Sequence, residues 1–392
     1  MCRSATCQSC TANNQLHLTS ARHDHDAPSP LSPSDKCAKL RQRKVEKHSI
    51  AAANSQKIRN MALLCAILVA AIHIDWIHDV PLSLGWFICN GVKDGYARIA
   101  VPFFFIVSGF FLAKHFEEDH WWGHEANKRV HSLVIPFLLW SIISLVGALL
   151  LGIGADIAAH RPFGTGIYFI HGTNWLRIFG FDLTEWPLHV PLWYVRCLIF
   201  FVLTGHAFKY LVAKCRYAWI VMAFAFMLVQ NHIPNENLRA FFDMAYSASG
   251  IFYFSVGIFM HMFNLTRTTK QKAISAGIMG FALLAAKLLF AYKGWRFEMM
   301  LGKLSIPFLI YFSWHFATPA RLPNWLTACS FPIFLMHTIL FGYCGVIIRR
   351  TAIGGLAQNF VVFFCGIAGA IAITFILRRF VPKVATMLFG GR

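Results

Sequence analysis

Long apolar runs separated by short polar segments dominate the chain after residue 57. Ten such runs occur, at residues 61–78, 99–114, 132–151, 191–211, 219–230, 246–263, 273–292, 301–316, 325–348 and 356–377. A helix needs roughly 20 apolar residues to cross a hydrocarbon layer of about 30 Å. The pattern therefore predicts an all-α, polytopic membrane protein with about ten transmembrane helices. Within the longest connection, residues 152–190, we expect a half-inserted or surface helix.

Composition supports the same class. Hydrophobic residues make up 57% of the 392 residues and charged residues only 14%, which is too apolar for a soluble globular protein. The formal net charge of +19 does not indicate nucleic acid, because Lys and Arg lie mainly in alternate loops between apolar runs. The 11 cysteines show no disulfide-framework spacing.

Three regions follow from this pattern. Residues 1–57 are polar, rich in Ser, Ala and His, and predict a disordered basic cytoplasmic tail without a signal peptide. Residues 58–380 form the predicted membrane domain, and residues 381–392 a short cytoplasmic C-terminal tail. Cys2, Cys7 and Cys10 could supply zinc ligands, but the tail lacks the paired knuckles of a structural site, so we expect no metal.

The distribution of positive charge sets the expected orientation. With the N-terminus inside, most Lys and Arg fall on the inner side, and Arg349 with Arg350 is the clear exception. The interpretation is an integral plasma-membrane protein, multi-pass, with both termini cytoplasmic.

Two histidines inside apolar runs are the main candidates for chemistry. His73 lies twelve residues beyond Met61, and His337 lies twelve residues beyond Trp325 in another run that points outward, so the two rings should share a depth. Titratable groups at such depth are costly in lipid and usually face a protein interior or cavity. The alternative for His73 is a position at the hydrated outer end of the helix. The alternative for His337 and for His315 is an interhelical hydrogen bond.

Six segments together resemble the membrane acyltransferase 3 superfamily. They are AILVAAIHIDW, RIAVPFFFIVSGFFLAK, KRVHSLVIPFLLW, PLWYVRCLIFFVL, YFSVGIFM and LTACSFPIFLMHTIL, within roughly residues 57–377. The resemblance implies transfer of an acyl group, usually acetyl, from cytoplasmic acyl-CoA to a hydroxyl of an extracytoplasmic acceptor such as a cell-surface glycan. It implies acyl-CoA, with acetyl-CoA expected, as a co-substrate and no bound cofactor.

The resemblance also assigns roles, with two departures. His73 aligns with the family histidine and becomes the expected general base, with His337 as the second catalytic candidate. Relatives commonly carry Arg or Lys where this chain has Ala62, and Arg59, one turn earlier, is the candidate substitute. Relatives also often have two arginines where this chain offers the three residues Lys128, Arg129 and His131.

The donor site can be argued on physical grounds as well. Coenzyme A is a cytoplasmic polyanion, so cationic groups at an inner helix start, here Lys128, Arg129 and His131, would favour its docking. Ordinary positive-inside charge is the alternative explanation. Three further residues are expected to line a cavity: Arg98, Trp193 and Arg196.

We therefore expect an integral-membrane O-acyltransferase, with O-acetylation of a surface polysaccharide as the expected reaction. Its partners would be the lipid bilayer, acyl-CoA and a glycan or other hydroxyl acceptor, with no nucleic acid. The main alternative is a secondary transporter or glycan exporter, although the internal repeats typical of transporters are not evident. A noncatalytic membrane sensor with a metal-binding tail is a third reading.

Overall fold

The computed structural model describes residues 55–76, 80–158, 160, 162, 175–265, 268–317 and 322–391. These residues belong to one compact unit, Ala53–Arg392. Nearly all of the predicted tail, including its cysteines, lies outside the described residues. So does the middle of the 152–190 connection, where a surface helix was expected.

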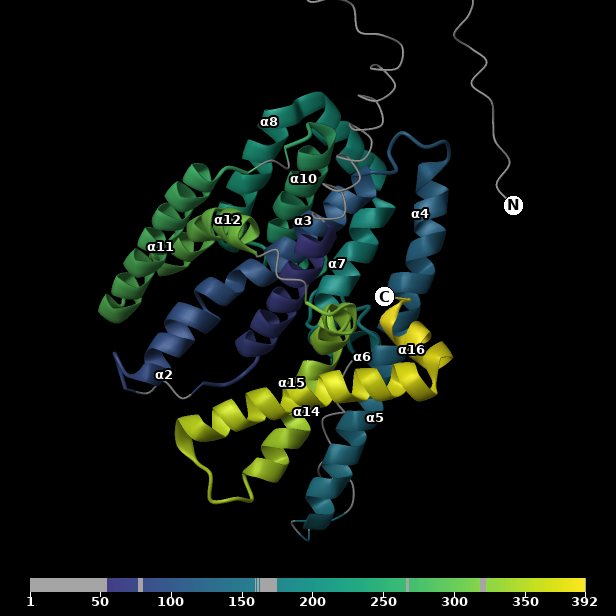
Figure 1. The fold of residues 1–392 in the computed structure, drawn as a ribbon, viewed down its shortest axis with the longest axis vertical. Helices are drawn as coiled ribbons and strands as arrows, with labels where there is room; N and C mark the ends of the chain where they lie inside the picture. Colours follow the sequence, from purple (N-terminus) through teal and green to yellow (C-terminus); the bar gives the residue numbers. More distant parts are fainter. Residues whose placement is uncertain are drawn as a thin grey trace, which may run out of the picture. The chain divides into compact units, whose positions relative to one another are not determined.

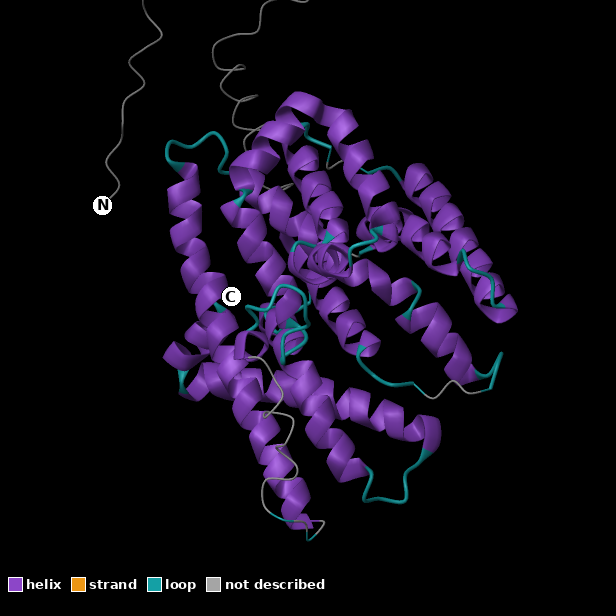
Figure 2. Ribbon diagram, turned by 180° about the vertical axis from the view of Figure 1, so that it is seen from behind, coloured by secondary structure: helices purple, strands orange, loops and turns teal. Residues whose placement is uncertain are grey.

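Every regular element in the described part of the chain is a helix, as Figures 1 and 2 show, which confirms the predicted fold class. After a first helix, Ser55–Ile72, the elements are α2 (Leu84–Phe87), η1 (Ile88–Lys93), η2 (Tyr96–Ile99), α3 (Ala100–Ala113), α4 (Trp121–Arg129), η3 (Val130–Val134), α5 (Ile135–Ala158), α6 (Trp175–Ile178), α7 (Leu192–Leu203), α8 (Gly205–Val229), η5 (Gln230–His232), α9 (Glu236–Ala240), η6 (Phe241–Ala245), α10 (Ala248–Met262), α11 (Lys270–Lys293), α12 (Glu298–Phe316), α13 (Asn324–Thr327), α14 (Ser330–Ile348), α15 (Gly355–Phe380) and α16 (Pro382–Phe389).

Seven helical segments of the described chain are long and apolar enough to cross a membrane. Two of them combine several elements: 84–113 runs from α2 to α3, and 121–154 runs from α4 into α5. Helices α7 and α10 are apolar but shorter, and α12 carries the eighth predicted run. Each of the ten predicted runs thus overlaps at least one helix, while the count of ten spans is approximate.

Helices α3 and α10 pack with their backbones in close contact. A Cβ atom on Gly257 of α10 would lie 2.0 Å from the carbonyl oxygen of Ile106, and one on Gly109 of α3 would lie 2.1 Å from that of Phe254. Only glycine fits at such crossings, as in other helix pairs built on small residues. This contact fixes the wall of α3 that faces the site described below.

Two more helix pairs pack closely within the described unit. Helices α11 and α12 lie side by side, as do α14 and α15 (Figure 1), and Gly280 of α11 lets the side chain of Leu309 on α12 approach. The indole N–H of Trp140 on α5 donates to the carbonyl of Leu388, 3.0 Å away, and so fastens α16 to α5.

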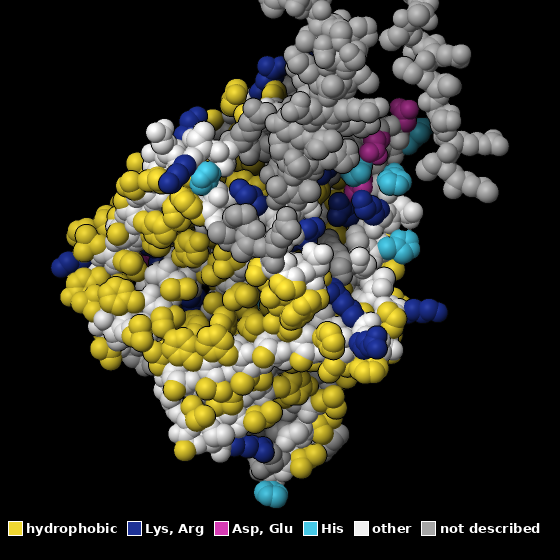
Figure 3. Space-filling view, viewed as in Figure 1, with side chains coloured by type: hydrophobic (Ala, Val, Ile, Leu, Met, Phe, Trp, Pro, Cys, Tyr) yellow, Lys and Arg dark blue, Asp and Glu magenta, His cyan; other side chains and the backbone are white. Residues whose placement is uncertain are grey.

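The surface of the unit is apolar over broad areas. Figure 3 shows hydrophobic side chains covering most of the viewed face below its upper end, where charged groups gather. On α15, the side chains of Phe364, Phe375 and Phe380 are all exposed. Exposed apolar area of this extent is stable in hydrocarbon and not in water, so these helices are embedded in a lipid bilayer.

Candidate active site

The structure brings the two predicted histidines together. His73 follows the last residue of the first helix, Ile72, and its ring centroid lies 5.0 Å from that of His337 in the middle of α14, at an interplanar angle of 45°. His73 is exposed, whereas His337 is fully buried. His73 is therefore the more accessible residue of the pair, and His337 is enclosed by protein.

Hydrogen bonding defines the tautomer of His337. Its Nδ1 lies 3.1 Å from the carbonyl oxygen of Ile333, and a carbonyl can only accept, so Nδ1 carries the proton. The other ring nitrogen, Nε2, then holds a lone pair. It is buried and has no hydrogen-bond partner among the described residues. A buried, unpaired acceptor is costly unless a reacting or orienting group uses it.

A third histidine, His189, supports α14 and was not predicted from the sequence. It is buried in the segment before α7, where its Nε2–H donates to the carbonyl of Leu335, 2.7 Å away. The hydroxyl of Thr338 lies 3.4 Å from its Nδ1, and Trp140 stacks on the ring. These contacts hold α14 on both sides of His337. A lone histidine before an apolar run gave no sequence signal for this role.

A cavity of about 500 Å³ opens beside the histidine pair and gathers three of the predicted donor-binding residues. Arg59 reaches it from the first helix, and Lys128 and Arg129 reach it from α4. Ala62, which stands where relatives carry a cation, lines the same cavity. Arg59 is braced by Ser55, whose hydroxyl accepts a 3.0 Å hydrogen bond from its Nη1. The wall formed by these residues is cationic.

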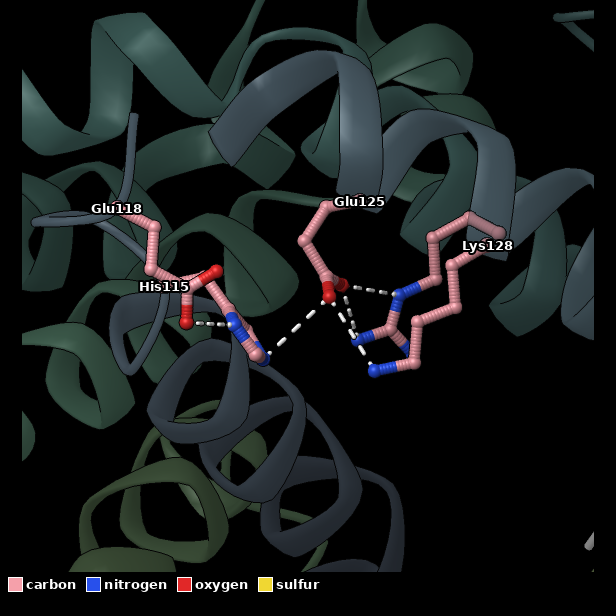
Figure 4. A network of polar contacts seen from close by, with 5 residues as sticks. His115, Glu118, Glu125 and Lys128 are labelled. Carbon is pink, nitrogen blue, oxygen red and sulfur yellow. Dashed lines mark hydrogen bonds and ion pairs between the residues drawn. The ribbon is translucent and has the colours of Figure 1, made fainter. Parts of the chain in front are cut away.

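An ion network holds the cations of α4 in place (Figure 4). Glu125 is completely buried; Lys128 Nζ lies 3.3 Å from its Oε1, and Arg129 Nη2 lies 3.0 Å from its Oε2. His115 lies between this carboxylate and that of Glu118, with contacts of 3.4 and 2.8 Å. The sequence analysis missed Glu125, although its spacing of three and four residues from the two cations is that of helical ion pairs.

Aromatic side chains form the cavity wall nearest the histidines. Phe104, Tyr194 and Phe334 all line the cavity, and their ring centroids lie 5.5 to 6.1 Å apart. The hydroxyl groups of Tyr194 and Ser108 lie 3.3 Å apart. On its other side, Phe334 contacts His337, with centroids 6.3 Å apart. Phe334 therefore lies in contact with both the cavity and His337.

Four predicted binding residues do not line this cavity: Arg98, His131, Trp193 and Arg196. His131 donates from Nδ1 to the carbonyl of Asn127, 3.2 Å away, and is exposed. The side chain of Arg98, half exposed, pairs with Asp94 one turn earlier. Trp193 packs edge-to-face against other aromatic rings. Their functional roles stay predictions.

Arg196 has a different setting from the one expected of a cavity residue. This arginine of α7 is buried, and its guanidinium donates to backbone carbonyls: Nη1 to Gly180 at 2.9 Å, and Nη2 to Glu185 and Met244, each at 3.2 Å. Each is a charge-assisted hydrogen bond from the cationic guanidinium to a neutral carbonyl oxygen, which helps to stabilise the buried cation. The side chain fastens the loop before α7 and the short helix η6 to α7.

The described part of the chain contains no candidate metal site. No group of three or more His, Cys, Asp or Glu side chains there could hold a metal ion. The predicted absence of a metal in the cysteine-containing tail concerns residues outside the described ones.

Comparison with known protein families gives one match. A family model described as an acyltransferase domain matches residues 58–379, which is most of the chain and includes both histidines and the cavity. Comparisons with curated proteins and with solved structures produced no match.

Proposed function

The chain belongs to the acyltransferase 3 family, and on that premise we propose that it transfers an acyl group, with acetyl as the expected group, from acyl-CoA to a hydroxyl of an extracytoplasmic glycan. One observation carries the proposal. The ring of His73 lies against that of His337, and His337 contacts Phe334, an aromatic residue that lines a cavity with three cationic side chains.

The reaction needs a base and a leaving group, and a thioester already supplies the second. In the proposed step, His73 removes the proton of the acceptor hydroxyl as its oxygen attacks the thioester carbon. The carbon–sulfur bond then breaks, and the coenzyme A thiolate takes the proton back from the imidazolium. His337 Nε2, with its unused lone pair, is suited to accept an N–H from His73 and so orient its other nitrogen toward the acceptor.

The donor is assigned to the cavity on electrostatic grounds. Acyl-CoA carries several phosphate charges, and Arg59, Lys128 and Arg129 line one space of about 500 Å³. Guanidinium and ammonium groups are the side chains suited to phosphate. The apolar rings at the other end of the cavity suit the uncharged pantetheine arm. Under this proposal the cationic mouth faces the cytoplasm of a plasma-membrane protein, and His73 faces outward.

The proposal is tested with purified protein in lipid vesicles, acetyl-CoA labelled in the acetyl group, and extracted cell-surface glycans. Label is expected on the glycan with wild-type protein and not with His73→Gln. Glycan movement across the vesicle membrane without label transfer would overturn the proposal in favour of an exporter.

A further inference from the structure

We propose that Glu125 is a positioning residue that assembles the phosphate-binding wall of the donor cavity. The inference rests on the proposed function, since it takes acyl-CoA as the donor. It concerns a side chain that does not itself line the cavity, although His115, Lys128 and Arg129 around it do.

The carboxylate of Glu125 uses both oxygens. Oε1 accepts from Lys128 Nζ at 3.3 Å and lies 3.4 Å from His115 Nε2, while Oε2 accepts from Arg129 Nε at 3.2 Å and Nη2 at 3.0 Å. The side chain is 0% exposed, whereas that of Lys128 is 53% exposed. Glu125 is thus a buried anchor between the labelled side chains of His115 and Lys128 (Figure 4), and Lys128 reaches toward solvent.

This anchoring leaves donors free for a ligand. Arg129 has five N–H bonds, and the contacts through Nε and Nη2 leave Nη1 unused by Glu125. Lys128 has three N–H bonds and gives one to Oε1. Without the carboxylate that both contact, the two cations would repel each other and move apart. With it, they present their remaining N–H groups from fixed positions.

The network also joins two parts of the chain. His115 lies in the turn that follows α3, and Glu125, Lys128 and Arg129 lie on α4. Glu118, half exposed, contacts His115 on the side away from Glu125. The wall is therefore assembled across a loop, which makes its geometry dependent on the central carboxylate.

Electrostatics gives the test a definite sign. Removal of a negative charge beside an anion site strengthens anion binding by Coulomb attraction alone. If Glu125 only adds charge to the wall, Glu125→Gln should tighten coenzyme A. If it positions the cations, the same variant should weaken binding, because the amide cannot hold two cations at once.

The experiment measures binding of coenzyme A to purified full-length protein in lipid nanodiscs by calorimetry. Glu125→Gln is expected to raise Kd roughly tenfold while kcat at saturating donor stays within about twofold of wild type. Glu118→Gln is the matched control, since it removes a nearby carboxylate that contacts only the outer side of His115; its Kd should change little. Thermal unfolding of both variants reports whether each remains folded.

A double-mutant cycle with Arg129→Gln tests the assigned route. If Glu125 acts through Arg129, Glu125→Gln should have much less effect in the Arg129→Gln background. An unchanged or lower Kd in folded Glu125→Gln, or full additivity in the cycle, would overturn the positioning role while leaving the acyltransferase proposal intact. Failure of wild-type protein to bind coenzyme A would instead remove the donor assignment, and this inference with it.

Discussion

The imidazole rings of His73 and His337 lie with their centroids 5.0 Å apart, one at the end of the first helix and the other inside α14. The contact joins elements from opposite ends of the sequence. The two histidines differ in their settings. His73 is exposed and can meet an acceptor, whereas His337 is buried and has a defined tautomer.

Replacement of His73 by glutamine should abolish most turnover. The amide keeps a similar size and hydrogen-bonding capacity but cannot take the proton, and loss of a positioned base typically lowers rates by about a hundred to ten thousand fold. Initial rates of label transfer from acetyl-CoA measure the effect. His315→Gln is the control. His315 lies near the end of α12, and its Nδ1 is 3.0 Å from the hydroxyl of Thr268. Transfer within a few fold of wild type in His73→Gln would move the base to His337.

Replacement of His337 by glutamine should lower kcat and leave the KM for the donor nearly unchanged. The orienting partner of a catalytic imidazole contributes up to about ten-thousandfold in rate, and we expect roughly a hundredfold here because His73 keeps its own backbone position. The double variant with His73→Gln should be little worse than His73→Gln alone, since the two rings act as a unit. Independent, additive losses would contradict the pairing.

Loss of one cavity cation should weaken binding of the donor more than binding of the acceptor. Arg129→Ala is expected to raise the KM for acyl-CoA several fold more than the KM for the acceptor, with a weaker salt dependence than wild type because one phosphate contact is lost. Lys214→Ala, which removes an exposed cation of α8, is the matched control. Equal changes in both KM values would remove Arg129 from the donor site.

The close contact between α3 and α10 should be intolerant of a methyl group. Gly257→Ala places Cβ against the Ile106 carbonyl and is expected to destabilise the fold by about 1–3 kcal/mol, as overpacking does elsewhere. Gly123→Ala is the control, because a Cβ at that position meets nothing within 4 Å. Thermal unfolding in detergent compares the two, and equal midpoints would show that the helices can separate freely.

The proposed orientation can be tested with single cysteines on a cysteine-depleted background. A cysteine at Thr184, in the loop before α7, should react with an impermeant reagent in intact cells. One at Lys270, the first residue of α11, should react only after permeabilisation. The reverse pattern would place the cationic cavity on the outer side and contradict the donor assignment.

Periodicity and run length were sufficient for the architecture, because the bilayer forces apolar helices of a limited range of lengths. They were less accurate at the ends. The first helix begins at Ser55 and α14 begins at Ser330, and not at Met61 and Trp325, so the equal twelve-residue offsets do not describe real helix positions. The rings of His73 and His337 still meet, because helix packing, and not helix numbering, sets their approach.

The polar details of the site depended on contacts that no local pattern contains. Arg196 was expected in a cavity, yet its partners are carbonyls of the loop before α7 and of η6, whose position only the folded chain defines. His189 binds the backbone of α14 from a distant segment. Glu125 differs, because its spacing from Lys128 and Arg129 is visible in the sequence as that of helical ion pairs.

The rings of Phe104, Tyr194 and Phe334 bear on a problem that every enzyme acting across a bilayer faces. A continuous water-filled path from the donor cavity to an outward-facing His73 would leak protons and dissipate the membrane potential. Under the proposed function, the three rings act as a hydrophobic seal when no donor is bound, and the pantetheine arm must displace Phe334 to bring its thioester to the histidines. Catalysis and membrane integrity then both depend on Phe334. A smaller side chain at this position would admit the donor more easily, but it would also make the membrane more permeable to ions.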